Sequence, residues 1–362
     1  MKNMIICLGG AGNNCAQEIM LSPALQDVDL YAIDSVTSNV DLDNMGRVNF
    51  ISIQSDESSG SGRDRGRSQA MYEFHEENGD FEELYMAAEE AKTPVIIITS
   101  SAGGTGSGAC VPLCKALIDR EVKVIPIIIC PNKKDPMAFH LNTNDLLMEL
   151  GELDIKTYAI FENFRSGADY AITNGEIIEF IEIILGKRYN KTSLDSIDDS
   201  DLNNIVSWPG RLMAFTVEGV SVDDTSREVI RKAYNGSQPS WGDKINDSTI
   251  VTAFSLKSMF ADKDHDAVFK ELRERFDPSK VFDEYKNIVV DNNGGKMTAT
   301  VIIAGLPSPE TKEIDTEFVE TAGLGNGRKK SRRPSFISGK KAVITETPAG
   351  TTGSSIKKFK YK

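Results

Sequence analysis

The sequence predicts an α/β protein built on a doubly wound parallel sheet, followed by a smaller α/β domain. Three observations lead to this fold class. Apolar segments typical of strands alternate with helical patterns over about the first 165 residues, as in a parallel sheet covered on both faces. Glycine-rich runs follow two of these strands directly. The chain has 362 residues and 40% apolar content, which is enough for two domains with full cores.

The first domain, expected over residues 1–166, contains six strands and five helices. The unbroken apolar run from Val124 to Cys130 is typical of a strand buried on both faces. The strands are expected at 4–8, 30–34, 48–52, 95–99, 124–130 and 157–161. The helices are expected at 13–20, 66–76, 80–91, 108–120 and 142–151.

A long helix is expected to connect the two domains over residues 167–190. Its apolar residues recur at helical spacing in a segment without proline; they are Ile177, Ile178, Ile181, Ile184 and Leu185. The second domain, 191–307, should contain a smaller sheet and end in a C-terminal helix over 308–322. Its strands are expected at 211–217, 250–256, 287–290 and 298–303, and its helices at 225–234 and 264–276.

The charge of the chain is divided between an acidic body and a basic tail. The tail, residues 323–362, has eleven lysines and arginines against the single acid Glu346, so with a net charge of -13 the first 322 residues carry -23. Its composition of Gly, Ser, Thr and Lys predicts a flexible segment. A basic segment of this kind favours an anionic partner.

Cysteine usage and hydropathy indicate a cytoplasmic protein with no membrane partner. The five cysteines lie in or beside apolar segments, and we expect reduced core residues. Cys110 and Cys114 share a helix face, but no second Cys/His pair has ligand spacing, so no metal held by a side-chain cluster is expected. The longest apolar runs are too short to cross a bilayer, and no basic region precedes an apolar stretch at the N-terminus.

The glycine-rich run after the strand at 95–99 predicts a phosphate-binding loop. Glycines let backbone N–H groups approach a polyphosphate, and the helix that follows directs its positive end at the anion. A Walker A loop is excluded because the run ends without a lysine. The expected phosphate-binding residues are Gly103, Gly104, Thr105, Gly106, Ser107 and Gly108.

A second glycine cluster follows the strand at 4–8 and adds Gly9, Gly10, Ala11 and Gly12 to the expected phosphate-binding residues. By itself the cluster is also compatible with an ordinary glycine turn. A third alternative is a dinucleotide fingerprint, as in an NAD-dependent oxidoreductase, with Asp34 at the end of the next strand. However, Cys15 stands where that fingerprint has its third Gly or Ala, and the run at 103–108 would have no role.

Together the two loops resemble those of the tubulin/FtsZ superfamily of GTPases. Residues 103–108 match the family signature GGTG(S/T)G, and GGAGNN at 9–14 is similar to the family's first loop. The resemblance covers roughly residues 1–320 and implies a tubulin/FtsZ-like fold that binds GTP and GDP. A third loop, residues 59–65, is similar to the family segment over the γ-phosphate, which implies phosphate contacts by Gly60, Gly62 and Arg63. Arg65 is a further candidate, and a solvated polar loop is the alternative.

The resemblance also implies a site for guanine and ribose. In the family, an Asn of the first loop reads guanine, an aromatic residue at the start of the long helix stacks on it, and an amide one turn later contacts its edge. A residue before that helix contacts ribose or base. The matching residues here are Asn13 or Asn14, Glu162 or Asn163, Tyr170 and Asn174.

A Mg²⁺ ion is expected from the charge of a triphosphate. The hydroxyls of Thr105 and Ser107 are candidates to order the ion or the phosphate oxygens. Asp34 is a candidate to bind the ion through water.

The resemblance places a catalytic pair after the long helix, where the family loop reaches the nucleotide of the neighbouring subunit. Asp198 and Asp201 match the FtsZ pattern of two acids, which orient and polarise the attacking water. A second register, Asp201 with Asn204, loses one acid. Alternatively, these acids only start a helix, because Asp is favoured at N-caps. The catalytic interpretation implies a head-to-tail filament.

Within the superfamily, the chain looks most like TubZ, the plasmid- and phage-borne branch that segregates DNA. In TubZ systems a DNA-binding adaptor on a centromere-like site binds the C-terminal tail. The residues to which this implies adaptor contact are Arg328, Lys329, Lys330, Arg332, Arg333, Lys357, Lys358 and Lys360. Direct DNA binding by these cations is a rival, and a solubilising tail without a partner is another.

Two other kinds of function stay open from the motifs. An FtsZ-like division filament or a phage-positioning filament would carry the same GTP-binding loops. A non-polymerising interaction protein would keep its nucleotide only for structure.

Overall fold

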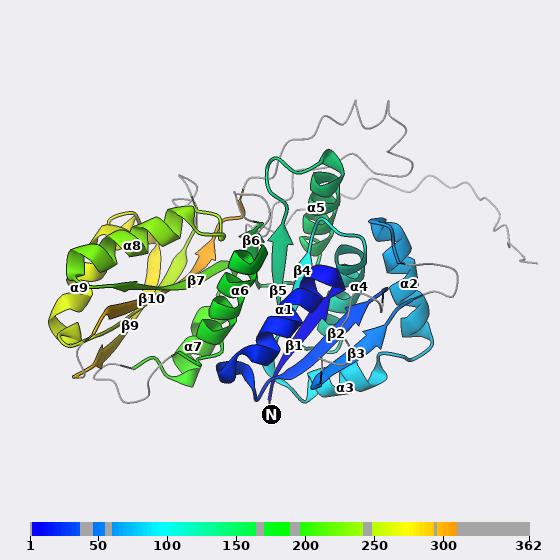
Figure 1. Ribbon diagram of the computed structural model, residues 1–362, viewed down its shortest axis with the longest axis horizontal. Coiled ribbons are helices and arrows are strands. Elements are labelled where there is room, and N and C mark those ends of the chain that lie inside the picture. The colour runs from blue at the N-terminus through cyan, green and yellow to red at the C-terminus, as the bar shows by residue number, and fades with distance from the viewer. Residues whose placement is uncertain are drawn as a thin grey trace, which may run out of the picture.

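The computed structural model describes residues 2–36, 46–54, 60–163, 170–188, 196–241, 248–292 and 295–309 (Figure 1). Except for its first two residues, the helix expected over 308–322 lies outside these ranges. The basic tail 323–362, with all its candidate partner-binding residues, lies outside them as well.

Ten strands of the described chain form one sheet, in the order β3-β2-β1-β4-β5-β6-β7-β10-β8-β9. The first six run parallel, as predicted. The strands are β1 (Asn3–Leu8), β2 (Asp29–Asp34), β3 (Val48–Ser52), β4 (Lys92–Ser100), β5 (Val124–Cys130), β6 (Thr157–Glu162), β7 (Gly210–Gly219), β8 (Ile250–Ser258), β9 (Val281–Val290) and β10 (Met297–Leu306).

The helices lie close to their predicted ranges. They are α1 (Gly9–Leu21), α2 (Arg65–Glu77), α3 (Glu82–Glu89), α4 (Thr105–Asp119), α5 (Met137–Leu150), α6 (Tyr170–Ile184), α7 (Asp199–Val206), α8 (Val222–Asn235) and α9 (Ala261–Arg273). α5 begins five residues earlier than expected, directly after Pro136, and α6 ends at Ile184, six residues before its expected end. Proline fits the start of a helix because the first N–H groups have no partner there.

The strands of the second half continue the first sheet, whereas a second sheet was expected. The junction is narrow: β6 pairs with β7 only through Thr157 opposite Gly210 and Tyr158 opposite Arg211. β10 is antiparallel to both β7 and β8, and β9 is parallel to β8. The second half is therefore a mixed sheet joined edge to edge to a parallel one; in Figure 1, β1 to β5 lie on one side of α6 and β7 to β10 on the other.

Three apolar cores cover the two faces of this sheet. One core extends along a single face of both halves, beneath α1, α6 and α7. On the opposite face, α2 to α5 cover the first half and α8 and α9 cover the second. Because α6 lies in the shared core, the expected connecting helix packs against both halves (Figure 1).

The strand directions define two ends of the molecule. We call the end where β1 to β6 finish the carboxyl end, and the end where they begin the amino end. Since β7 is parallel to β6, the pairing order makes β8 and β9 begin at the amino end as well. Ligands of doubly wound sheets bind outside the carboxyl ends of the strands.

Candidate nucleotide site

Two adjoining cavities lie at the carboxyl end, in the first half of the sheet. The first has a volume of about 400 Å³ and the second about 240 Å³. Both are lined by Ala11, Arg63, Ser100 and Gly103, so they are neighbouring parts of one site. The first is also lined by Leu8, Gly9, Gly10, Asp34, Val36, Gly60, Ser61, Gly62, Gly104, Thr105 and Gly106.

The N-termini of α1 and α4 converge on the first cavity. Neither helix has a side-chain cap, and neither has an acid in its first turn. Uncapped N-terminal N–H groups carry partial positive charge and bind anions. The first cavity is therefore suited to phosphate groups.

Close packing between the glycine loops explains part of the glycine pattern. Gly9 has a φ of +67°, and a Cβ there would meet the backbone nitrogen of Gly106 at 2.8 Å. A Cβ on Gly104 would meet the backbone of Arg63 at 2.8 Å. By contrast, Gly10 and Gly103 have open space where a Cβ would stand. The first pair joins the loops together, and the second pair leaves room for a ligand.

Hydroxyl groups join Thr105 to the residue after β2, Ser35, and to the third loop, through Ser61. The Thr105 Oγ1 lies 2.7 Å from the Oγ of Ser35 and 3.1 Å from the Oγ of Ser61. Ser107, by contrast, is fully buried, and its hydroxyl donates to the carbonyl of Gly103. Of the two predicted hydroxyl residues, Thr105 lines the phosphate cavity and Ser107 shapes the loop beneath it.

Asp34 stands at the end of β2 and lines the first cavity. Its carboxylate accepts hydrogen bonds of 2.7 Å from the side chain of Asn13 and from the backbone of Ser35. Burial raises the pKa of Asp34, and these hydrogen bonds oppose the rise. Asn13 is buried beneath the site and lines neither cavity. Within the described chain, its buried Oδ1 has no hydrogen-bond partner.

The two arginines of the third loop have different surroundings. Arg63, at a φ of 69°, lines both cavities, and its guanidinium lies 4.9 Å from the ring centroid of Phe139. Arg65 is buried and donates to both carboxylate oxygens of Glu149, at 3.0 and 2.8 Å. Arg63 can therefore face a ligand, whereas Arg65 holds α2 against α5.

The second cavity contains most of the residues expected around guanine and ribose. It is lined by Asn14, Asn163, Tyr170 and Asn174. Tyr170 leaves 60% of its surface exposed, so its ring is available for stacking. Glu162 lines a different cavity. Of the alternatives that the sequence left open, Asn14 lines this cavity and Asn13 does not, and Asn163 lines it whereas Glu162 does not.

The site also includes residues that the motifs did not predict. Ser61 and Ser100 line the first cavity, and Asn142 donates to the carbonyls of Arg63 and Ala102, at 3.2 and 3.1 Å. Ser100 lies at the start of the glycine-rich run and could have been found there. Asn142 and Phe139 come from the first turns of α5, where no local pattern marks them.

The predicted catalytic acids lie at the amino end, far from both cavities. The Lys92 Nζ lies 3.7 Å from a carboxylate oxygen of Asp199, so α7 begins beside the start of β4. Ser100 ends the nine-residue strand at the first cavity. At about 3.3 Å per residue, the two ends of β4 are about 26 Å apart. Asp198 and Asp201 therefore cannot reach a nucleotide in the same chain.

The two acids form a helix start in this chain. Asp198 caps α7 by accepting from the N–H groups of Ser200 and Asp201, at 2.7 and 2.8 Å. The Asp201 carboxylate accepts in return from the Asp198 N–H at 3.2 Å. The N-cap arrangement considered as the alternative is thus present, and it presents both carboxylates at the exposed amino end.

Comparison with known proteins agrees with this geometry. A family model described as the Tubulin/FtsZ family, GTPase domain, matches residues 2–164. Residues 2–164 therefore form a GTPase domain of the Tubulin/FtsZ family. These residues include both glycine loops, the third loop and all of β1 to β6. No curated protein sequence matches the chain.

Solved structures of three tubulin/FtsZ branches share the fold. A GTPγS-form protofilament of TubZ from Bacillus thuringiensis serovar israelensis is 16% identical, with a TM-score of 0.66, and covers 90% of this chain and 92% of its own. CetZ2 from Haloferax volcanii, a GTPγS-bound protofilament, is 17% identical with a TM-score of 0.62, and the match covers 90% of this chain and 98% of the CetZ2 chain. An FtsZ dimer from M. jannaschii is 15% identical with a TM-score of 0.64, and the match covers 84% of this chain and 88% of the FtsZ chain. These similar values do not distinguish one branch.

The match to a GTPase domain implies GTP binding and hydrolysis by that domain. The TubZ and CetZ2 structures that share the fold are protofilaments. None of the helices in the described part of the chain has the length and apolar character to span a bilayer. Among the described residues, no three His, Cys, Asp or Glu side chains gather to hold a metal ion. All five cysteines are buried thiols.

Proposed function

We propose that the protein is a GTPase that polymerises head to tail and hydrolyses GTP at the junction between two subunits. The observation that carries this proposal is the separation of the acids Asp198 and Asp201 from the phosphate cavity by the length of β4. One subunit contributes the nucleotide at its carboxyl end, and the next contributes the acids at its amino end. A contact between unlike ends does not close on itself and produces a filament.

Each part of the site has a role in this reaction. The β- and γ-phosphates occupy the first cavity, where the N-termini of α1 and α4 and the guanidinium of Arg63 stabilise the negative charge of the transition state. Guanine occupies the second cavity against Tyr170, with Asn174 at its edge. The neighbour's Asp198 and Asp201 orient and polarise the attacking water.

A Mg²⁺ ion fits this site as part of the nucleotide complex. Asp34 and Thr105 both line the phosphate cavity, so they would hold the ion through water. When bound, the ion neutralises charge that develops on the phosphate oxygens.

Turnover as a function of protein concentration tests the shared site. Each active site needs two subunits, so phosphate release per molecule should rise with concentration and then level off above the concentration at which GTP-dependent filaments sediment. Electron microscopy with and without GTP should show filaments only in the first case. A constant turnover per molecule on dilution contradicts a shared site.

We further propose that the filament moves plasmid or phage DNA through an adaptor bound to residues 323–362. The support is the resemblance to TubZ and the charge of the tail, which has eleven basic residues and one acid. An adaptor seated on DNA would bind the tail, whereas direct DNA binding would fall steeply as salt rises.

Two binding measurements separate the cargo alternatives. The full chain and a chain ending at residue 322 are mixed with DNA alone and with a candidate DNA-binding protein encoded next to this chain. Tail-dependent binding to that protein supports the adaptor. Salt-sensitive binding to DNA alone supports direct contact, and equal behaviour of the two chains removes the tail from cargo binding.

A further inference from the structure

An exposed aromatic pair stands beside α7 at the amino end. The rings of Trp208 and Phe282 are stacked with centroids 4.7 Å apart. Phe282 leaves 68% of its surface exposed, although it is a large apolar side chain. Trp208 is held in place, because its indole N–H donates to the Thr249 carbonyl at 3.0 Å and a Cβ on Gly305 would meet its ring at 2.8 Å.

The chain topology places this aromatic pair at the same end of the molecule as Asp198 and Asp201. Phe282 is the second residue of β9, and Trp208 lies between the end of α7 and the start of β7. Both strands begin at the amino end. Tyr285 of β9 interacts with the side chain of Asn204 of α7, so the strand and the helix are in contact.

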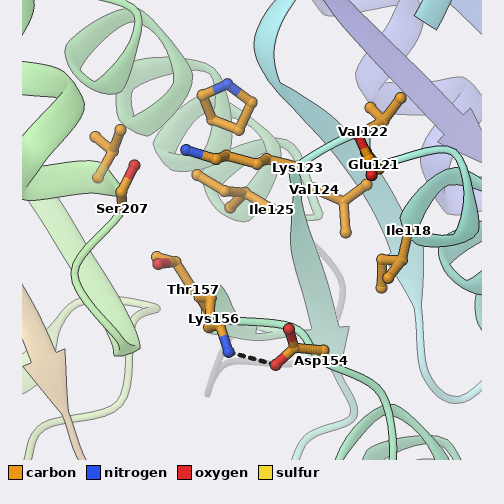
Figure 2. A pocket seen from close by; sticks show the side chains of 12 residues that line it. Ile118, Glu121, Val122, Lys123, Val124, Ile125, Asp154, Lys156, Thr157 and Ser207 are labelled. Carbon is orange, nitrogen blue, oxygen red and sulfur yellow. Dashed lines mark hydrogen bonds and ion pairs between the residues drawn. The ribbon is translucent and has the colours of Figure 1, made fainter. Parts of the chain in front are cut away.

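A cavity of about 410 Å³ adjoins α7 on its other side. It is lined by the starts of β4, β5 and β6 and by Val206 and Ser207 at the end of α7. Figure 2 shows Ser207 on one side of this cavity, with Ile118 and Val122 on the other. The acids therefore lie at the start of α7, and the cavity and the aromatic pair lie at its end, where Ser207 precedes Trp208.

Most exposed large apolar side chains of the described chain lie at the two ends of the sheet; two others, Phe74 and Met86, lie on α2 and α3. Leu21 and Phe282 lie at the amino end. The carboxyl end carries a larger set, at the ends of strands or the starts of helices: Met137, Tyr170, Ile172, Val220, Met259, Phe260 and Val290. Exposed apolar residues at two opposite ends are typical of a molecule whose ends meet.

We infer that Phe282, stacked on Trp208, is the aromatic anchor through which the amino end of one subunit binds the carboxyl end of the next. The inference rests on the proposed filament and adds to it the residue on which assembly depends. Rigid aromatic side chains contribute most to such interfaces, because they bury a large area and lose little conformational entropy. The partner is a second copy of this chain, which presents its own exposed apolar residues around the nucleotide.

The test compares Phe282→Ala with Phe74→Ala in the full chain. Phe74 is matched in type and exposure, at 62%, but lies on α2 near the opposite edge of the sheet. With GTP, Phe282→Ala should raise the critical concentration for sedimentation about tenfold, which corresponds to about 1.4 kcal/mol. Phe282→Tyr and Phe74→Ala should assemble like the wild type, and GTP binding by the unassembled Phe282→Ala protein should be unchanged.

A fluorescence measurement tests the same contact without altering Phe282. Trp208 and Trp241 are the two tryptophans of the chain, and Trp241 is buried. In a Trp241→Phe variant, Trp208 emission should shift to shorter wavelength when GTP-dependent filaments form.

The outcomes separate the anchor from the filament. If the wild type assembles but Phe282→Ala has an unchanged critical concentration, or Trp208 emission does not move on assembly, the anchor is wrong and the filament stands. If the wild type shows no GTP-dependent sedimentation, the proposed function fails and the anchor fails with it.

Discussion

The Nζ of Lys92 lies 3.7 Å from the Oδ2 of Asp199 and ties the first turn of α7 to the start of β4. Both side chains are largely exposed, at 43% and 67%, so the ion pair contributes little to stability. Its importance is positional. The other end of β4 reaches the phosphate cavity, and the acids of α7 are therefore directed away from the nucleotide of their own chain.

The double variant Asp198→Ala with Asp201→Ala tests the catalytic role of these acids. Phosphate release at saturating protein and GTP should fall at least about 100-fold, because the attacking water is no longer polarised. GTP-bound filaments should persist. The capping box of α7 is also lost, which should lower the free energy of unfolding by about 0.5–2 kcal/mol.

Asp199→Ala is the matched control for this pair, since Asp199 lies in the same turn and its exposed partner is Lys92. It should keep wild-type turnover and stability. Unchanged turnover in the double variant would remove both acids from the mechanism.

Tyr170→Ala should weaken GTP binding about tenfold, since stacking of a base on an aromatic ring contributes about 1–3 kcal/mol. The side chain is mostly exposed, so the melting temperature should not change. Titration of a fluorescent GTP analogue below the critical concentration measures the effect. Ile172→Ala, exposed and two residues further along α6, lines neither cavity and is the control. Equal affinities of the two variants would contradict a base site at Tyr170.

Two neighbouring glycines should respond to alanine in opposite ways. At Gly103 the added methyl group enters open space in the cavity, so the protein should fold normally but bind GTP less tightly. At Gly104 it meets the backbone of Arg63, and stability should fall by about 1–3 kcal/mol. Urea unfolding and GTP titration separate the two effects. Loss of stability at Gly103 without loss of binding would show that its position is structural.

Asp34→Asn should change how stability depends on pH. Burial raises the pKa of Asp34 in the folded chain, so the folded state binds the proton more tightly than the unfolded state. The wild type should therefore lose stability as pH rises from about 3.9, the ordinary value, through the raised value. The neutral asparagine removes this loss, and the buried Asn13 Oδ1 gains a donor.

Urea midpoints at pH 4 and pH 7 test this prediction. The urea midpoint of the variant, taken relative to that of the wild type, should be higher at pH 7 than at pH 4. The pH 4 measurement serves as the internal reference. A parallel pH dependence in both proteins would show that the Asp34 proton is not linked to folding.

Much of the first half could be predicted from local sequence. The parallel strands, the helices that follow them and the glycine loops are signalled by runs of neighbouring residues, whose spacing and backbone needs are local. The same signals did not show that the Ser107 hydroxyl donates within its own loop, to the Gly103 carbonyl four residues earlier. They did not show that Arg65 lies away from the cavity either, because its partner Glu149 meets it only when α2 packs against α5. Phe139 and Asn142 went unpredicted for the same reason.

By itself, the sequence determined that this protein has a doubly wound nucleotide domain with GTPase loops, because apolar periodicity and glycine spacing are properties of short segments. Only the tertiary structure decided that Asn14 and Asn163, instead of Asn13 and Glu162, line the second cavity. It also decided that β7 extends the first sheet and that the acids and Phe282 share the end opposite the nucleotide. These relationships depend on strand pairing between segments far apart in the chain, and no local pattern encodes a distance between them.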